Sequence, residues 1–309
     1  MSAGSTFTLD QLSRRLLWED IDVAYLTEWL CFCRQEDFLG KGLRKPPVHA
    51  EDVTTNCVQG KMEGAAVLKA KVPLWVCGLG LVPLILEQYG EACSFVPYAS
   101  DGKKVGAGES LGMIKGNAAV LLEAERLVLN CLQHLSGIAT QTARYLPYFD
   151  SSSTRLLDTR KTTPGWRILE KYAVACAGGW NHRFGLFDRI LFKDNHRALA
   201  VARGVPFTEF LKQAKSRYPE LPLEVEVDEL EQIAPLLELG VDIILLDNFS
   251  TADLACAVNL IGNAAYTEAS GNITLERLPE LVELGLDFIS SGALTHQSVW
   301  VDISLDWQW

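Results

Sequence analysis

The chain lacks any long hydrophobic run. Nowhere in its 309 residues does an unbroken apolar stretch approach the roughly 18 residues that a membrane-spanning helix needs. The N-terminus, Met-Ser-Ala-Gly-Ser-Thr, also lacks a basic region followed by an apolar one, so we expect no signal peptide. Both absences predict a cytoplasmic protein with no membrane partner.

Positive charge is in deficit as well. The chain has 28 Lys and Arg residues against 39 Asp and Glu residues, which gives a formal net charge of −11. A nucleic-acid partner would require a basic face, so we expect none. A small anionic ligand is not excluded, because a few arginines can make a positive pocket in an acidic protein.

Paired-cysteine and nucleotide motifs are missing too. The eight cysteines include no CxxC pair, and although Cys31 and Cys33 could hold a metal, nothing supplies a second pair of ligands. Buried free thiols in a reducing cytoplasm are the favoured interpretation. Gly78-Leu-Gly80 lacks the third glycine of a dinucleotide fingerprint, and no GxxxxGK(S/T) segment occurs, which argues against both nucleotide-binding classes.

What the chain does have is a repeated alternation, between residues 155 and 292, of short β-branched runs and amphipathic helices. Apolar strands with polar C-terminal tips are typical of a (β/α) barrel active site. We expect the helices at 166–177, 207–217, 229–238, 251–261 and 275–284. The strand ends carry cations and carboxylates, and they are Asp158-Thr-Arg-Lys161, Lys193-Asp-Asn-His196, Glu224-Val-Glu226, Asp247-Asn248, Glu268-Ala-Ser-Gly271 and Ser290-Ser-Gly292.

The regions outside this repeat indicate a second domain. Residues 51–120 read as strands with one helix at 80–89, residues 121–148 have the periodicity of one long helix, and residues 302–309 could return as a strand to the N-terminal region. With 48% hydrophobic residues the chain can bury one large core or two smaller ones. We predict an α/β enzyme with an N-terminal domain at 1–150, joined by 297–309, and a barrel domain at 151–296.

Four cations gather at the strand tips and in their loops, namely Arg160, Lys161, Arg183 and Lys193. Arginine grips a carboxylate or phosphate through two hydrogen bonds, and lysine supplies a point charge. The alternative is that they are solvated charges paired with nearby carboxylates such as Asp158, Glu170 or Asp188. Four together favour a site for a multiply anionic ligand, and His182 could donate to the same anion.

The other predicted strand ends carry carboxylates and small residues. Glu224 and Glu226 lie two apart on one strand and so face one side of the sheet, and Asp247 ends the next strand. Such groups at a barrel rim can bind magnesium or ribose hydroxyls, or they can neutralise the neighbouring lysines, and both roles are compatible. Ser270-Gly-Asn272 and Ser291-Gly-Ala293 are either phosphate-binding turns or simple tight turns, and the nearby cations favour phosphate.

The ordered set of motifs resembles quinolinate phosphoribosyltransferase over about residues 51–305. The resemblance implies an N-terminal α/β sandwich plus the open, incomplete (β/α) barrel of type II phosphoribosyltransferases, in agreement with fewer than eight βα units. It also implies transfer of phosphoribosyl from phosphoribosyl pyrophosphate to quinolinate, with decarboxylation, in NAD biosynthesis. The motifs that carry it are Glu125-Arg-Leu-Val-Leu-Asn130, Leu135-Ser-Gly-Ile-Ala-Thr140, Asp158-Thr-Arg-Lys-Thr-Thr-Pro-Gly165, His182-Arg183, Lys193-Asp-Asn-His196, Glu224-Val-Glu226, Leu245-Leu-Asp-Asn248, Glu268-Ala-Ser-Gly271 and Gly292-Ala-Leu-Thr-His296.

The resemblance also implies residue roles. The two carboxylates of quinolinate would be bound by Arg126 from a partner subunit, Arg160, His182, Arg183 and Lys193. Phosphoribosyl pyrophosphate and its Mg²⁺ would be bound by Lys161, Glu226, Asp247, Ser270, Gly271, Gly292 and His296. Of these, the catalytic residues would be Lys161, Glu226 and Asp247, and the metal ligands would be Glu226 and Asp247.

Family members are typically homodimers, and larger assemblies of dimers also occur, so we expect Arg126 to reach the neighbouring site. Apolar residues of the same helix, such as Leu127, Leu129 and Leu132, could form part of the contact. The alternative is that Arg126 only pairs with Glu123 or Glu125 on its own helix.

The N-terminal region departs from the family pattern. Members usually have an acidic pair followed almost at once by a Gly-Asp-(Ile/Val)-Thr-Thr segment. Here Glu19-Asp20 and Glu51-Asp-Val-Thr-Thr55 stand about 30 residues apart. The aromatic-rich residues 21–50 between them have no role that the resemblance supplies.

Two alternatives compete with the enzyme. A pyrophosphorylase-like paralogue associated with molybdate transport shares the Thr-Arg-Lys-Thr and His-Arg segments, but it lacks the pair at Lys193-Asp194 and the Leu-Asp-Asn at 246–248, and this chain has both. A non-catalytic anion-binding protein on a decayed barrel would have lost a catalytic cation or carboxylate, and none is lost. The enzyme is therefore the favoured interpretation.

Overall fold

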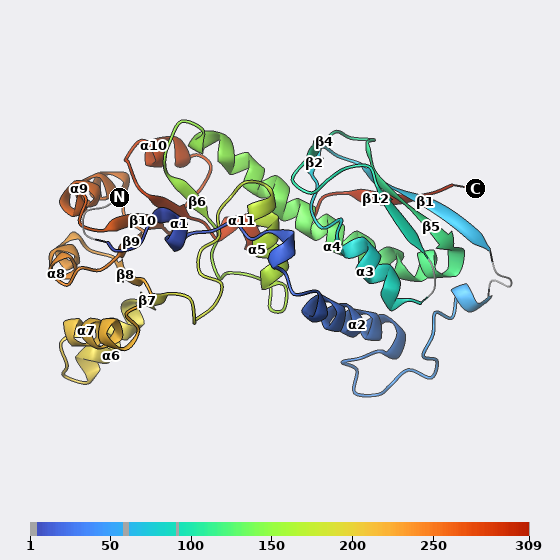
Figure 1. Ribbon diagram of the computed structural model, residues 1–309, viewed down its shortest axis with the longest axis horizontal. Coiled ribbons are helices and arrows are strands. Elements are labelled where there is room, and N and C mark those ends of the chain that lie inside the picture. The colour runs from blue at the N-terminus through green and yellow to red at the C-terminus, as the bar shows by residue number, and fades with distance from the viewer. Residues whose placement is uncertain (1–4, 58–61, 91–92, 309) are drawn as a thin grey trace. The chain divides into compact units, whose positions relative to one another are not determined.

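The computed structural model describes residues 5–57, 62–90 and 93–308. Two earlier predictions fall partly outside this range. Residues 1–4 are part of the segment considered for a signal peptide, and residue 309 is the last residue of the predicted returning strand. The chain divides into two compact units (Figure 1). We call them the barrel unit, made of the residues up to Arg15, 142–174 and 178–297, and the sandwich unit, made of 16–141, 175–177 and the residues from Ser298.

The barrel unit contains a sheet of six parallel strands. In sequence the strands are β6 (Arg155–Leu157), β7 (Ile190–Phe192), β8 (Leu223–Val227), β9 (Ile243–Asp247), β10 (Tyr266–Ser270) and β11 (Phe288–Ser290). Their order in the sheet is β6-β11-β10-β9-β8-β7, so β6 and β7 are edges and the sheet does not close in the described residues. The predicted open, incomplete barrel is confirmed.

Helices connect these strands as the alternation predicted. They are α5 (Arg167–Cys176), α6 (Asp194–Ala202), α7 (Phe207–Arg217), α8 (Ile233–Glu238), α9 (Thr251–Ile261), α10 (Leu278–Val282) and α11 (Ala293–His296). Local chemistry explains where helix α9 begins. The Ser250 hydroxyl caps this helix by accepting a hydrogen bond from the Asp253 N–H at 3.2 Å. Helix α6 was not among the expected helices, because its first turn coincides with the polar tip of β7.

Residues 5–15 and 142–150 group with the barrel unit, whereas the prediction placed all of 1–150 in the N-terminal domain. The Ser5 hydroxyl donates to Asp242 just before β9, so this segment lies at the N-terminal ends of the strands. Helix α1 (Leu9–Leu12) places Leu12 in a buried cluster with Leu157, Ile243, Tyr266 and Phe288. Burial of these apolar side chains, which no local pattern reveals, decides the boundary.

The sandwich unit is built on an antiparallel sheet with the order β12-β1-β5-β3. Its strands are β1 (Glu63–Ala70), β3 (Ser94–Pro97), β5 (Ser110–Asn117) and β12 (Ile303–Gln308), and β2 (Leu74–Trp75) pairs separately with β4 (Lys104–Val105). The pairing of β12 with β1, Leu305 opposite Leu68, confirms the predicted return of the C-terminal residues. Helix α3 (Leu81–Gln88) matches the helix predicted at 80–89.

Residues 21–50, which the sequence left without a role, contain helix α2 (Val23–Leu39). Its Leu26 and Leu30 are fully buried, and the helix packs on α3. Phe38 meets Tyr89 edge to face at 5.7 Å. Phe38 therefore serves packing within the sandwich unit, whereas Tyr25 and Phe32 of the same segment are exposed.

Helix α4 (Ala118–Tyr145) corresponds to the long helix predicted at 121–148. Leu127, Leu129 and Leu132 are buried within the described chain, with exposed fractions of 8%, 5% and 1%. The expectation that these leucines form a contact with a partner subunit is therefore wrong, because they pack inside their own chain. Among the described residues, no helix is both long and apolar enough to cross a membrane.

Candidate active site

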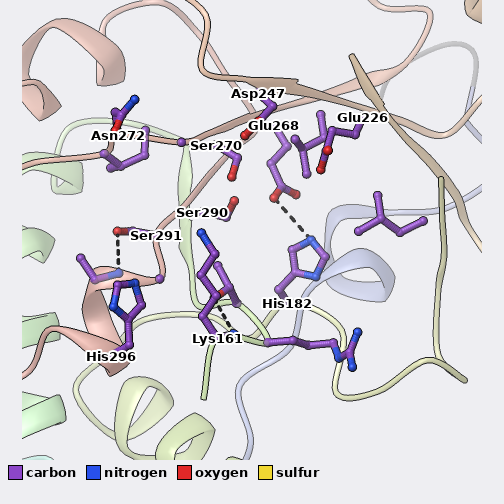
Figure 2. A pocket seen from close by; sticks show the side chains of 18 of the residues that line it. Lys161, His182, Glu226, Asp247, Glu268, Ser270, Asn272, Ser290, Ser291 and His296 are labelled. Atoms are coloured by element: carbon purple, nitrogen blue, oxygen red, sulfur yellow. Dashed lines mark hydrogen bonds and ion pairs between the residues drawn. The ribbon is translucent and has the colours of Figure 1, made fainter. Parts of the chain in front are cut away.

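The polar strand tips meet in one cavity of about 630 Å³ within the barrel unit. In-register pairing aligns the tips, since Ser270 lies opposite Asp247 in neighbouring strands. Figure 2 shows the side chains of Lys161, Glu226 and Glu268 around the same space. Of the predicted site residues, the cavity is lined by Arg160, Lys161, His182, Arg183, Lys193, Glu226, Asp247, Ser270, Gly271, Gly292 and His296.

Three of the four predicted cations have no counterion. Within the described residues Arg160, Lys161 and Arg183 form no ion pair, whereas the Lys193 ammonium contacts Glu226. Burial lowers the pKa of Arg183. The negative charge of Glu224 raises this pKa, and the positive charge of Arg160 lowers it further. The alternative of ordinary paired surface charges therefore fails for all but Lys193, and the cavity is suited to an anion.

Asp158 has a structural role at the tip of β6. Its fully buried carboxylate contacts the Lys171 ammonium of α5 and accepts from Asn181 Nδ2 at 2.7 Å and from the His182 N–H at 2.9 Å. Burial raises the pKa of Asp158, and these donors counter it. The carboxylate thereby fixes the loop that carries Arg183 into the cavity.

Glu226 and Asp247 provide two carboxylates at neighbouring tips. Burial raises the pKa of both, the Lys193 ammonium lowers it, and the charge of Asp247 raises that of Glu226 further. In the described residues neither belongs to a group of three metal-ligating side chains. Magnesium is commonly held by one or two carboxylates together with substrate phosphates and water, so this pair of hard oxygen donors fits it.

The glycines at the ends of the later strands allow neighbouring side chains of the chain to lie close to the backbone. A Cβ added to Gly292 would lie 2.8 Å from Lys161 Cδ, and at Gly271 it would lie 2.2 Å from Asn248 Oδ1. Gly271 has φ +84°, and Asn248 has the positive φ of 59°. Glycine and asparagine both tolerate this left-handed backbone region, so the geometry suits a binding turn and a simple tight turn alike.

His182 lines the cavity, but its ring nitrogens are engaged elsewhere. Nδ1 accepts from the Arg183 N–H at 2.7 Å, and Nε2 lies 3.4 Å from Glu268 and 3.5 Å from Glu224. Arg189 Nη1 donates to Glu224 at 2.8 Å. In this arrangement His182 faces two buried carboxylates rather than offering a free donor to an anion.

Several lining residues were not predicted as site residues. They are Thr159, Leu191, Leu245, Glu268, Asn272, Ile273, Thr274, Ser290, Ser291, Ala293 and Gln297. For Glu268 a signal existed, since it lies two residues before Ser270 on one strand and so faces the same side. The other residues of this list are uncharged, so the sequence offered no comparable signal for them.

Arg126 does not line the cavity. It is exposed on α4, and within the described residues it forms no ion pair with Glu123, Glu125 or any other carboxylate. The alternative of a pair on its own helix is therefore not found, and its predicted role at a neighbouring subunit's site stays a prediction.

Sequence comparison identifies the family to which the chain belongs. The profile of the quinolinate phosphoribosyl transferase N-terminal domain matches residues 52–136, and that of the C-terminal domain matches residues 138–306. The chain belongs to the quinolinate phosphoribosyltransferase family. Its first 51 residues precede both matches, which is where the sequence departed from the family pattern.

Individual members of the quinolinate phosphoribosyltransferase family are similar along most of their length. A probable nicotinate-nucleotide pyrophosphorylase (carboxylating) of Bacillus subtilis is 38% identical over 82% of this chain and 87% of its own. The corresponding protein of Synechocystis is 37% identical over 93% of this chain and 92% of its own. The solved nicotinate-nucleotide pyrophosphorylase of Francisella tularensis superposes with a TM-score of 0.82 at 33% identity, covering 93% of this chain and 98% of its own.

Proposed function

We propose that this chain transfers the phosphoribosyl group of phosphoribosyl pyrophosphate to quinolinate and releases pyrophosphate and CO₂, giving nicotinate mononucleotide for NAD biosynthesis. The observation that carries the proposal is the cavity in which Arg160, Lys161 and Arg183 lie beside two carboxylates and form no ion pair with any described residue. Quinolinate is a dicarboxylate and the second substrate carries phosphates on both sides of its ribose, so both require such cations. The names of the relatives support the same reaction.

The residues of the cavity divide between the two substrates. Arg160, Arg183 and Lys193 bind and orient quinolinate, with its pyridine nitrogen toward the anomeric carbon. That nitrogen attacks as pyrophosphate leaves, through an oxocarbenium-like state that Glu226 and Asp247 stabilise. Lys161 stabilises the charge on the leaving group. The phosphoribosyl pyrophosphate is further held by Ser270, Gly271, Gly292 and His296.

The metal proposed for this site is Mg²⁺, held by Glu226 and Asp247. When bound, it neutralises charge on the pyrophosphate. The support is the pair of carboxylates in one cavity, each with a pKa that burial raises. A divalent cation compensates for such desolvated charge.

One assay tests the activity, the substrate and the metal. We expect nicotinate mononucleotide to form from quinolinate with Mg²⁺, but hardly from nicotinic acid, because one carboxylate-binding arginine would then be left buried without a partner. Excess chelator should abolish turnover, and Asp247→Asn should impair the use of phosphoribosyl pyrophosphate. Equal turnover of both acids, or full activity in chelator, would contradict the respective part of the proposal.

We propose further that the active form is a homodimer in the cytoplasm, with Arg126 completing the neighbouring site. The support for the shared site is an exposed arginine without an ion pair, in a helix that the family resemblance associates with the substrate. The support for a reducing compartment is that all eight cysteines are free.

A further inference from the structure

Three side chains that can bind a metal meet in the sandwich unit, and none of them lines the cavity described above. They are Cys77 in the loop after β2, Asp101 in the turn before β4, and Cys176 at the end of α5. Their ligand atoms, two sulfurs and a carboxylate oxygen, all lie within 4.8 Å of one another. Cys77 is buried, and the other two are partly exposed. The two cysteines are far apart in the chain and form no CxxC pair, so the sequence did not reveal this group.

Hydrogen bonds hold Cys77 and Asp101 in place. The Cys77 N–H donates to the Ser136 hydroxyl of α4 at 3.0 Å, and the same hydroxyl donates to the Cys77 carbonyl at 3.2 Å. Asp101 accepts the N–H groups of Gly78 and Leu79 at 2.9 and 3.0 Å, one on each carboxylate oxygen. A carboxylate oxygen has two lone pairs, and metal-binding carboxylates are commonly hydrogen-bonded as well. Fixing the loop before α3 is therefore compatible with binding a metal.

The end of α5 brings the second sulfur to the group. The sulfur of Cys176 lies 3.7 Å from the carbonyl oxygen of Val76, the residue before Cys77. Gly102, which follows Asp101, allows this approach, because a Cβ added there would lie 2.8 Å from the Cys176 carbonyl oxygen. The Gly102 N–H also donates to the Val76 carbonyl at 2.8 Å. These backbone contacts do not depend on a metal, so the three ligands are already close together and little further ordering is needed for binding.

Without a metal, Cys77 is a thiol. Burial raises its pKa well above the ordinary value, and the contact with Cys176 and the charge of Asp101 raise it further. A bound divalent metal reverses this preference, because a coordinating thiol loses its proton. On binding, both S–H bonds break, the two protons pass to water, and the electron pairs left on the sulfurs form the bonds to the metal. The two thiolates cancel the charge of a divalent ion.

We propose that Cys77, Asp101 and Cys176 form a zinc site in the sandwich unit. Thiolates select zinc over magnesium, which prefers oxygen ligands, so this site is separate from the Mg²⁺ proposed for the cavity. With Zn–S bonds of about 2.3 Å, two sulfurs on a tetrahedral zinc lie about 3.8 Å apart, which agrees with the spacing of the group. Water supplies the fourth ligand through the partly exposed side. Because the unfolded chain does not hold the three ligands together, bound zinc stabilises the folded chain.

The test is a titration of the full chain, freed of metal and with its thiols reduced, with Co²⁺ as a coloured substitute for Zn²⁺. We expect a sulfur-to-cobalt charge-transfer band that saturates at one ion per chain and disappears when Zn²⁺ is added. Cys77→Ser and Cys176→Ser should lose the band, and Asp101→Asn should weaken binding by at least about tenfold. Zn²⁺ should also raise the thermal unfolding midpoint of the wild type, but not that of Cys176→Ser.

Two control variants separate this site from other metal ligands. The double variant Cys31→Ser/Cys33→Ser, which removes the cysteine pair of α2, should keep the band, and so should Asp247→Asn, whose cavity supplies oxygen ligands. Circular dichroism shows whether each variant is folded, and if Cys77→Ser is not, Cys176→Ser carries the test at the partly exposed sulfur. No band in a folded wild type with all its thiols reduced, or a band that survives Cys176→Ser, would overturn the proposal. None of these measurements depends on the proposed reaction.

Discussion

Lys161 is one of the residues for which we propose a catalytic role. It is exposed to the cavity, forms no ion pair in the described residues, and its charge lowers the pKa of Asp247. Lys161→Ala should raise the barrier of the chemical step by about 2–4 kcal/mol, as for other electrostatic catalytic groups. The check is kcat beside that of Lys212→Ala, an exposed lysine of α7 outside the cavity. A near-normal rate for Lys161→Ala would mean that it only neutralises carboxylates.

Glu224 offers a prediction about pH. Burial alone would raise its pKa, but His182 and Arg189 lower it from 4.5 to about 2. A depressed folded-state pKa contributes stability above the unfolded value that is lost as the pH falls through the folded value. The difference in unfolding free energy between wild type and Glu224→Gln should therefore be constant above about pH 5 and shrink as the pH falls toward 2. Urea unfolding across this range measures it, and a difference that does not change with pH would contradict the ionised state of Glu224.

At the scale of elements, the short helix α1 packs into the core of the barrel unit. Leu12 is 2% exposed among side chains from β6, β9, β10 and β11, and the Arg189 guanidinium donates to its carbonyl. Leu12→Ala should lower the unfolding free energy by about 2–5 kcal/mol, because the removed atoms leave a cavity. Leu17→Ala, at a residue that is 58% exposed, is the matched control. Denaturant unfolding that shows no difference between the two variants would mean that α1 is not anchored through Leu12.

At the scale of the whole molecule, the proposed sharing of sites between two subunits makes a prediction that a monomer cannot satisfy. Arg126→Ala and Lys161→Ala should each be nearly inactive, and mixing them should restore activity. Random exchange gives one intact site in each mixed dimer, so recovery should approach about a quarter of wild type. The activity of the mixture is measured after subunit exchange has been demonstrated with labelled chains. No recovery would place Arg126 in its own chain's site or outside the site.

The meeting of the candidate site residues in one cavity could be predicted from the sequence because they lie at or just after strand ends. Lys161, Glu226 and Asp247 each follow or end a short apolar strand, and parallel strands bring their C-terminal ends to one edge. Helices at 207–217 and 251–261 begin and end where their periodicity predicts, and the Ser250 side chain caps the second. Glu268 was missed as a site residue although it lies two residues before Ser270 on one strand and so faces the same side, and its burial beside His182 is what only packing reveals.

The sequence by itself determined the class of fold, the family and the charge of the cavity, because alternation, motif order and strand tips are local patterns. Only the tertiary structure decided that residues 5–15 join the barrel unit, that the leucines of α4 are buried, and that His182 faces two carboxylates. Each of these depends on contacts between residues distant in the chain. Burial and pairing are properties of the neighbours that folding supplies, and a linear pattern does not specify them.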